Sequence, residues 1–174
     1  PVPEGGQGQH LLRINAAGAT VWDRSLKGWL FSTVVALPDG GLFAVGSRTF
    51  SPGQVAGIMR LDGNGQTLWS KEFPLVPGTT LGGLGSALAT SDGGFVLSAW
   101  GEDGTTFDGM PWLIRIDASG TVLWEKRYAG NPAWSGSLFA LPDSVIGMSG
   151  GNGTSGGVLR FAPDGSVLGA TVHA

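Results

Sequence analysis

Short apolar runs alternate with turn residues along almost the whole chain. Runs such as STVVAL and GLFAVG contain β-branched and aromatic side chains, and turns rich in Gly, Pro and Asp separate them. Strands favour side chains that pack on a pleated surface, and tight turns need residues that tolerate positive φ, so this pattern is typical of short β-strands. No helical periodicity of useful length is present. The pattern therefore predicts an all-β fold.

One segment occurs four times, and each copy starts with an arginine inside an apolar strand. A glycine stands five residues after every arginine, and a tryptophan stands four residues beyond the glycine in three copies. We interpret each copy as a β-hairpin whose glycine occupies a left-handed turn position. The arginines are Arg13, Arg60, Arg115 and Arg160, the tryptophans are Trp22, Trp69 and Trp124, and Gly169 takes the place of the fourth tryptophan.

A second hairpin alternates with the first. It reads STVVALPDGGLFAVGS at 32–47, GSALATSDGGFVLSAW at 85–100 and GSLFALPDSVIGMSG at 136–150. Asp-Gly between two apolar runs is a strong hairpin signal, because the turn needs positive φ and a short side chain that bonds its own backbone. In the last copy Ser144 replaces the first turn glycine, and we expect that hairpin to have one residue fewer. Together the two hairpins make a unit of four strands, A and B around the Asp-Gly turn and C and D between the arginine and the tryptophan.

A four-stranded unit that recurs about every 45 to 55 residues predicts β-propeller blades, and a tandem β-sandwich is the alternative. We expect one propeller-type domain over 1–174, with a half-blade at 10–25 and antiparallel four-stranded blades at about 32–74, 85–129 and 136–172. The half-blade has only a C–D hairpin, so the array contains about three and a half blades. The chain could be a fragment of a larger propeller, be completed by another chain or copy, or be a divergent small propeller. We favour the first two, because proteins normally cover an exposed sheet edge.

The repeated arginine, turn acid and tryptophan indicate a structural role. A partly buried arginine must be paired, and its candidate partners are Asp62 and Asp117 in the C–D turns or Asp39, Asp92 and Asp143 in the A–B turns. The tryptophan can span from one sheet to the next while its indole N–H donates one hydrogen bond. Because an active site would break the repeat symmetry, we expect ion pairs and docking rings rather than a ring of arginines around an anionic ligand.

The segments RLDGNGQTLWSKEF (60–73) and RIDASGTVLWEKRY (115–128) resemble the tryptophan-docking motif of quinoprotein-like β-propellers. The longer segment SDGGFVLSAWGEDGTTFDGMPWLIRIDASGTVLWEKRYAG (91–130) is more similar still to a family of bacterial and archaeal secreted repeats. The resemblance covers about 10–172 and implies a β-propeller in an exported, often surface-attached protein with no general enzymatic activity. The fourth copy departs from the motif, because it has Ala162 in place of the acid.

Composition and charge exclude several classes of protein. A net charge of −3 without a Lys/Arg cluster argues against nucleic acid as a partner. The absence of cysteine excludes disulfides and thiolate metal sites, and it is compatible with export. No apolar run reaches the roughly 18 residues of a membrane span. His10 and His173 are the only histidines and stand near the ends, so we expect no hydrolytic triad, no enzymatic activity and no resident cofactor.

Two sets of loop residues are candidates for binding. The loop GEDGTTFDGMP carries Glu102, Asp103 and Asp108, which could hold Ca²⁺ through carboxylate oxygens or be a solvated acidic loop. Trp29 and Trp134 lie in connections from D to A strands. Tryptophans there could contact a protein or stack on a sugar, or they could pack over strand ends as a lid.

The sequence therefore favours a non-catalytic, extracytoplasmic β-propeller module that acts as a protein-interaction scaffold or as an accessory subunit of a larger assembly. A protein partner, further copies or further segments would complete the half-blade. A carbohydrate- or surface-binding, lectin-like module is the alternative, and a fragment of a quinoprotein-like enzyme is a more distant one.

Overall fold

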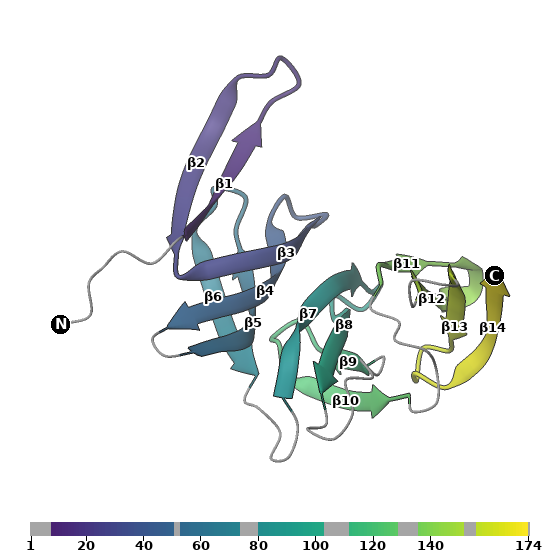
Figure 1. Ribbon diagram of the computed structural model, residues 1–174. Coiled ribbons are helices and arrows are strands. Elements are labelled where there is room, and N and C mark those ends of the chain that lie inside the picture. Colours follow the sequence, from purple (N-terminus) through teal and green to yellow (C-terminus); the bar gives the residue numbers. More distant parts are fainter. Residues whose placement is uncertain are drawn as a thin grey trace. The chain divides into compact units, whose positions relative to one another are not determined.

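The computed structural model describes residues 8–50, 53–73, 80–102, 112–128, 136–151 and 156–173, and they form fourteen strands and one short 3-10 helix (Figure 1). The strands build three antiparallel sheets of four strands and one sheet of two strands. This confirms the all-β fold with three propeller-type blades and a half-blade. The contacts divide the chain into two compact units, Pro1–Pro74 and Leu75–Ala174.

The first unit contains the half-blade and one complete blade. The half-blade is a two-stranded hairpin, and each strand of the complete blade pairs with the next strand in the chain. The half-blade is slightly longer than the predicted 10–25. The hairpin consists of β1 (Gly8–Ile14) and β2 (Thr20–Lys27), and the blade of β3 (Trp29–Ala36), β4 (Leu42–Phe50), β5 (Gly53–Leu61) and β6 (Thr67–Phe73).

The second unit contains two complete blades, and in both the strands again pair in chain order. The first consists of β7 (Thr80–Ala89), β8 (Phe95–Glu102), β9 (Trp112–Ile116) and β10 (Val122–Arg127). The second consists of β11 (Leu138–Ala140), the 3-10 helix η1 (Pro142–Ser144), β12 (Ile146–Gly151), β13 (Gly156–Phe161) and β14 (Val167–His173).

The four C–D hairpins share one turn geometry. The glycine in each turn has a φ between 74° and 80°, which confirms the predicted left-handed position. In the first blade Asp62 Oδ1 accepts hydrogen bonds from the amides of Asn64 and Gln66, at 2.9 and 2.8 Å. In the fourth copy, where alanine replaces the acid, Asp164 Oδ1 accepts from the amide of Ser166 instead. The glycines are Gly18, Gly65, Gly120 and Gly165, and the equivalent acceptors in the other two copies are Asn15 and Asp117.

The last A–B hairpin differs from the other two in its turn conformation. Its flanking pair, Ala140 and Ile146, is as far apart in sequence as the pair that flanks the first A–B turn, so the prediction of one residue fewer is wrong. Asp143 and Ser144 both have positive φ, 59° and 61°. In the other two A–B turns only the first glycine has a positive φ. The turn without that glycine therefore has a different conformation but the same length, and its two L-residues adopt this region at a cost of roughly 1–2 kcal/mol each.

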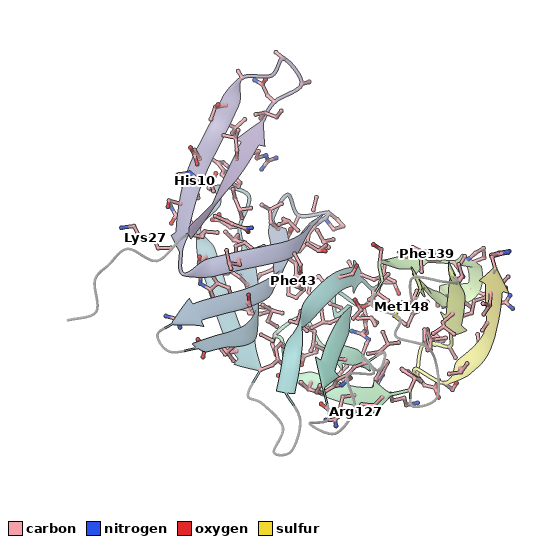
Figure 2. All side chains as sticks on the ribbon, in the orientation of Figure 1. His10, Lys27, Phe43, Arg127, Phe139 and Met148 are labelled. Atoms are coloured by element: carbon pink, nitrogen blue, oxygen red, sulfur yellow. The ribbon has the colours of Figure 1, made fainter. Side chains whose placement is uncertain are left out.

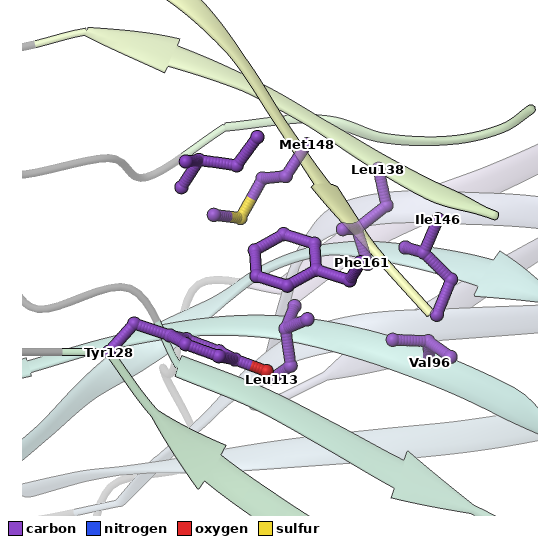
Figure 3. Close-up of a cluster of buried hydrophobic side chains, with 8 residues drawn as sticks. Val96, Leu113, Tyr128, Leu138, Ile146, Met148 and Phe161 are labelled. Carbon is purple, nitrogen blue, oxygen red and sulfur yellow. The ribbon is translucent and has the colours of Figure 1, made fainter. Parts of the chain in front are cut away.

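Each unit has a cluster of buried apolar side chains. The cluster of the second unit spans both of its sheets, and in the first unit the partly buried Leu11 and Leu26 of the hairpin pack against the cluster of the blade. In the second unit the rings of Tyr128 and Phe161 lie with their centroids 4.9 Å apart, and Met148 lies beside them (Figure 3). Phe43 of the first unit and Met148 of the second, both labelled in Figure 2, are fully buried. The first cluster consists of Trp29, Ala44, Met59 and Leu61, and the second of Val96, Leu113, Tyr128, Leu138, Ile146, Met148, Leu159 and Phe161.

Candidate functional site

The arginine of the second unit's first blade is buried, and it forms a hydrogen-bonded network with the exposed acid of the A–B turn. Arg115 Nη2 donates to both carboxylate oxygens of Asp92, at 2.7 and 2.6 Å. Its Nη1 donates to the carbonyls of Phe95, at 3.1 Å, and Ile116. Only 8% of the Arg115 side chain is exposed, so these bonds satisfy a charge that burial would otherwise penalise.

The first unit's complete blade repeats this network. Arg60 Nη2 donates to Asp39, and Nη1 donates to the carbonyls of Leu42 and Leu61. Of the two sets of acids that the sequence left open, the structure therefore pairs the arginines with the acids of the A–B turns. The acids of the C–D turns, such as Asp62, accept hydrogen bonds from turn amides instead.

The second glycine of each Asp-Gly-Gly turn makes room for the arginine. A Cβ atom on Gly41 would overlap Nη1 of Arg60, and one on Gly94 would overlap Nη1 of Arg115. Neither glycine has a positive φ, so close approach, rather than turn conformation, requires glycine there. Sequence reasoning assigned the turn to the first glycine and missed this role. The sequence did contain an indication of this role, because a turn with one left-handed residue needs only one glycine and the second one requires another explanation.

The carboxyl of Asp92 is held in its charged form. The Thr90 hydroxyl donates to it at 2.6 Å and the Gly94 amide at 3.2 Å, and with the Arg115 guanidinium they lower its pKa from 3.8 to about 2. The carboxylate is therefore a fixed anion at neutral pH, committed to the turn and the arginine. This arrangement suits a structural ion pair and gives no general acid.

The last blade lacks this network in the part of the chain that the structure describes. Arg160 is exposed there, with no ion pair to Asp143 among the described residues. By strand register Val145 takes the place of the second glycine, since the residue after it pairs with the residue after the arginine. Val145 thus has a side chain at the position where Gly41 and Gly94 leave room for the guanidinium. The ion pair that the sequence predicted for each blade is therefore missing from this one among the described residues.

The half-blade contacts the neighbouring sheet of its own unit through the turns. Arg13 Nη1 donates to the carbonyls of Gly63 and Gly40, at 2.7 and 3.3 Å. Trp22 Nε1 donates to the same Gly63 carbonyl at 2.9 Å, and its ring lies against Gly65. With no A–B turn in its own sheet among the described residues, Arg13 bonds to the turns of the next sheet, as Trp22 does.

Trp124 of β10 lies against the C–D turn of the last blade, in the same unit. Its ring packs against Gly165, and it adjoins the buried cluster of that unit. The hydroxyl of Tyr128 donates to the Gly165 carbonyl at 2.6 Å, and burial, with the nearby Asp164 carboxylate, raises the pKa of Tyr128 to about 12. Trp69 lies within its own unit at 6.1 Å from Phe43, in an edge-to-face arrangement.

The outer face and outer edge of the half-blade are open. In the described residues β1 pairs with β2 alone, whereas the C strands β5, β9 and β13 pair on both sides. Leu12 and Ile14 of β1 are each 57% exposed, although the equivalent residues of β5, Met59 and Leu61, are 3% and 0% exposed. Two core positions of the repeat are therefore on the surface here, beside an unpaired backbone edge.

His10 and Asp23 face the solvent on this hairpin. His10 Nδ1 lies 3.0 Å from Asp23 Oδ1, and both side chains are more than half exposed. Ser25 lies opposite His10 in the strand register, yet no hydrogen bond joins the two side chains among the described residues. The two side chains form a contact on the surface, without the enclosed setting in which such residues do acyl chemistry.

Trp29 is a core residue, which favours the packing alternative over contact with a ligand or partner. It is the first residue of β3 and 7% exposed, with its ring stacked on Phe31 at 5.5 Å between centroids. It belongs to the buried cluster of the first unit. Its ring lies so close to Gly57 that a Cβ on this glycine would collide with it. Trp134 lies outside the described residues.

The acidic loop offers no described site. Asp103 and Asp108 lie outside the described residues, as does the side chain of Glu102. The calcium hypothesis remains a prediction. Elsewhere in the described residues, no group of three or more acidic or histidine side chains could hold a metal ion. Within the same part of the chain, no helix is long and apolar enough to cross a membrane.

A cavity of about 430 Å³ lies between the two blades of the second unit. The Asp92–Arg115 pair forms part of its wall, with Val96, Ile146 and Pro163 among the apolar residues. Its volume is within the range of small-ligand pockets. The two charges in its wall already neutralise each other, so they leave no net charge to select a ligand.

No family model matches the chain, and no curated protein matches it. A crystal structure of a eukaryotic initiation factor is similar with a TM-score of 0.42 and 12% sequence identity. The match covers 92% of this chain and 48% of that one, so this chain spans about half of its length. A similarity at this level carries no argument about function.

Proposed function

We propose that this protein is a non-catalytic β-propeller module that acts as an interaction scaffold, or as an accessory subunit of a larger assembly. Its half-blade binds a protein partner, which completes the sheet that begins with β1. One observation supports this most directly. β1 has a free backbone edge in the described residues, and it exposes two apolar side chains, Leu12 and Ile14, at positions that are buried in a complete blade.

The chemistry of the described residues agrees with a binding role. The charged residues that recur in the repeat hold turns and strands together, as the pairs Arg60–Asp39 and Arg115–Asp92 do. We infer that the protein works outside the cytoplasm, in keeping with its lack of cysteine and its resemblance to secreted repeats. Cell fractionation of the source tests the location, and a purely cytoplasmic pool would contradict it.

Hydrogen exchange of the native particle tests the scaffold function. The particle is isolated from its source, and its mass is compared with that of the recombinant chain. We expect a larger mass, with β1 amides that exchange more slowly in the particle than in the recombinant chain, because partner strands protect paired amides. Amides of β9, which is paired on both sides, serve as the control. Equal masses with unprotected β1 amides would exclude a scaffold that works through this edge.

One of the two tryptophans that support the lectin-like alternative is buried. That alternative relied on Trp29 and Trp134 as exposed rings, and Trp29 is a core residue. A glycan-binding screen with a Trp134→Ala control still separates the two functions, since binding that depends on this ring would contradict a pure scaffold.

A further inference from the structure

We propose that the free edge of β1 recognises a particular partner: a β-hairpin of another polypeptide chain with an Asp-Gly-Gly turn, whose aspartate pairs with Arg13. This proposal rests on the proposed scaffold function and specifies the chemistry of the partner. It makes the half-blade a receptor for the same hairpin that the complete blades contain.

The complete blades supply the register for such a complex. In the first, Leu42 pairs with Leu61, and the next residue, Phe43, pairs with Arg60. The second-unit blade that carries Arg115 has the same register. Arg13 and Ile14 hold the equivalent positions in β1, opposite the same kind of D strand. The residue after the Gly-Gly pair should therefore lie opposite Ile14, and the following residue opposite Arg13.

Arg13 retains the donor that this contact needs. In the complete blades Nη2 binds the aspartate, and Nη1 binds carbonyls. In the half-blade Nη1 of Arg13 binds the carbonyls of Gly63 and Gly40, and Nη2 has no partner among the described residues. The Arg13 side chain is exposed, so an incoming carboxylate can reach it without displacing a core residue.

The second glycine makes the recognition selective. In both complete Asp-Gly-Gly turns a Cβ at this glycine would overlap the guanidinium. The last blade shows the alternative within the same chain. Val145 stands at that position, and Arg160 is exposed without an ion pair among the described residues. A hairpin that lacks the second glycine can still add a strand to β1, but its aspartate should not reach Arg13.

The Asp-Gly-Gly hairpins of the described residues are not available to β1. The two Asp-Gly-Gly hairpins, β3–β4 and β7–β8, are already hydrogen-bonded to β5 and β9 in their own sheets. A second copy would have to break one of these sheets to supply a hairpin. Another polypeptide with an unpaired Asp-Gly-Gly hairpin needs no such exchange, and its strand would add main-chain hydrogen bonds along the seven residues of β1.

A synthetic peptide tests the chemistry directly. The peptide copies residues 32–50, and binding to the full chain is measured by fluorescence anisotropy. We expect the peptide to bind, and we expect Asp39→Asn in the peptide to weaken binding about three- to tenfold, as for a partly exposed ion pair that includes charged hydrogen bonds. Gly41→Val in the peptide should weaken binding at least as much, because it blocks the guanidinium.

A double-mutant cycle assigns the effect to Arg13. In Arg13→Ala protein, the wild-type and Asp39→Asn peptides should bind equally well, since the pair is already broken. Lys27→Ala is the control, as this exposed cation lies on β2 of the same hairpin. Absence of peptide binding would overturn the proposal, as would an Asp39→Asn effect that persists in Arg13→Ala. Dimers of the full chain that Arg13→Ala dissociates would identify a second copy as the occupant and also overturn it.

Cross-linking tests the register, because the chain has no cysteine of its own. Ile14→Cys protein should form a disulfide with Leu42→Cys peptide, whereas Leu12→Cys protein should not. A negative result with the peptide can be told apart from a failure of the proposed scaffold function. If β1 is protected in the native particle but the peptide ignores Arg13, the scaffold remains and the hairpin chemistry is wrong.

Discussion

At the scale of residues, Arg115 and Arg60 lie in spaces that glycine leaves open. Each guanidinium binds an aspartate and two carbonyls, and the adjacent glycine has no side chain to displace it. The Asp-Gly-Gly sequence thus has three separate tasks. The acid binds the arginine, the first glycine takes the positive φ, and the second provides space.

Substitution at the second glycine should therefore destabilise the fold. We expect Gly94→Ala to lower the free energy of unfolding by about 1–3 kcal/mol, because its Cβ overlaps Arg115 and the Ile116 carbonyl. Gly156→Ala is the matched control, since a Cβ there meets its nearest atom at an ordinary 3.7 Å. Urea denaturation of both variants measures the difference. Equal stability of the two variants would refute the steric role of Gly94.

The Asp92 carboxyl should make stability depend on pH in the acid range. Its pKa is lowered to about 2 in the folded chain by Thr90, Gly94 and Arg115. A lowered pKa gives stability that is present above the unfolded pKa, near 3.8, and that is lost as pH falls toward 2. We expect the melting temperature of wild-type protein to fall more steeply between pH 4 and about 2 than that of Asp92→Asn. Parallel profiles would contradict this assignment.

At the scale of elements, the C–D hairpin is a repeated part with two kinds of surroundings. In a complete blade it pairs with strand B and its inner residues are buried, as Met59 and Leu61 are. In the half-blade the same hairpin remains on its sheet through turn contacts from Trp22 and Arg13, and through Arg24 Nη2, which donates to the Asn64 carbonyl at 3.0 Å. The half-blade is therefore held by a few directional bonds together with Leu11 and Leu26, which pack against the buried cluster of the unit.

Loss of one such bond should loosen the hairpin locally. Trp22→Phe keeps most of the apolar ring and removes the Nε1 donor to Gly63. We expect a loss of about 1 kcal/mol, which is about a fivefold faster hydrogen exchange of β1 and β2 amides. The amides of β3 to β6 should change less. An equal acceleration in both sheets would show that the hairpin does not open by itself.

At the scale of the whole molecule, the described chain contains two compact units, each with a buried cluster of its own. The sequence predicted a single domain over 1–174, since repeats of one kind ran through the whole chain. Stability in repeat proteins is approximately a sum of the units and their interfaces, so local perturbations need not spread over the whole chain.

A matched pair of core variants tests how far the units are coupled. Met59 belongs to the cluster of the first unit and Met148 to that of the second. We expect Met59→Ala and Met148→Ala each to cost about 2–4 kcal/mol, and each to accelerate hydrogen exchange mainly in its own unit. Hydrogen-exchange mass spectrometry resolves the two. If either variant accelerates both units equally, the chain unfolds as a single cooperative domain.

The sequence by itself determined the strands, the turns and the repeat, because these depend on short-range chemistry. Gly65 needs positive φ and Asp62 bonds amides within four residues, so local sequence contains the whole cause. Only the tertiary structure decided which acid Arg115 binds, since Asp92 reaches it through strand pairing rather than along the chain. It also decided that Trp29 is buried and that Leu12 and Ile14 are exposed. Burial depends on which sheet covers a residue, and neither the type of a side chain nor its place in the repeat contains that information.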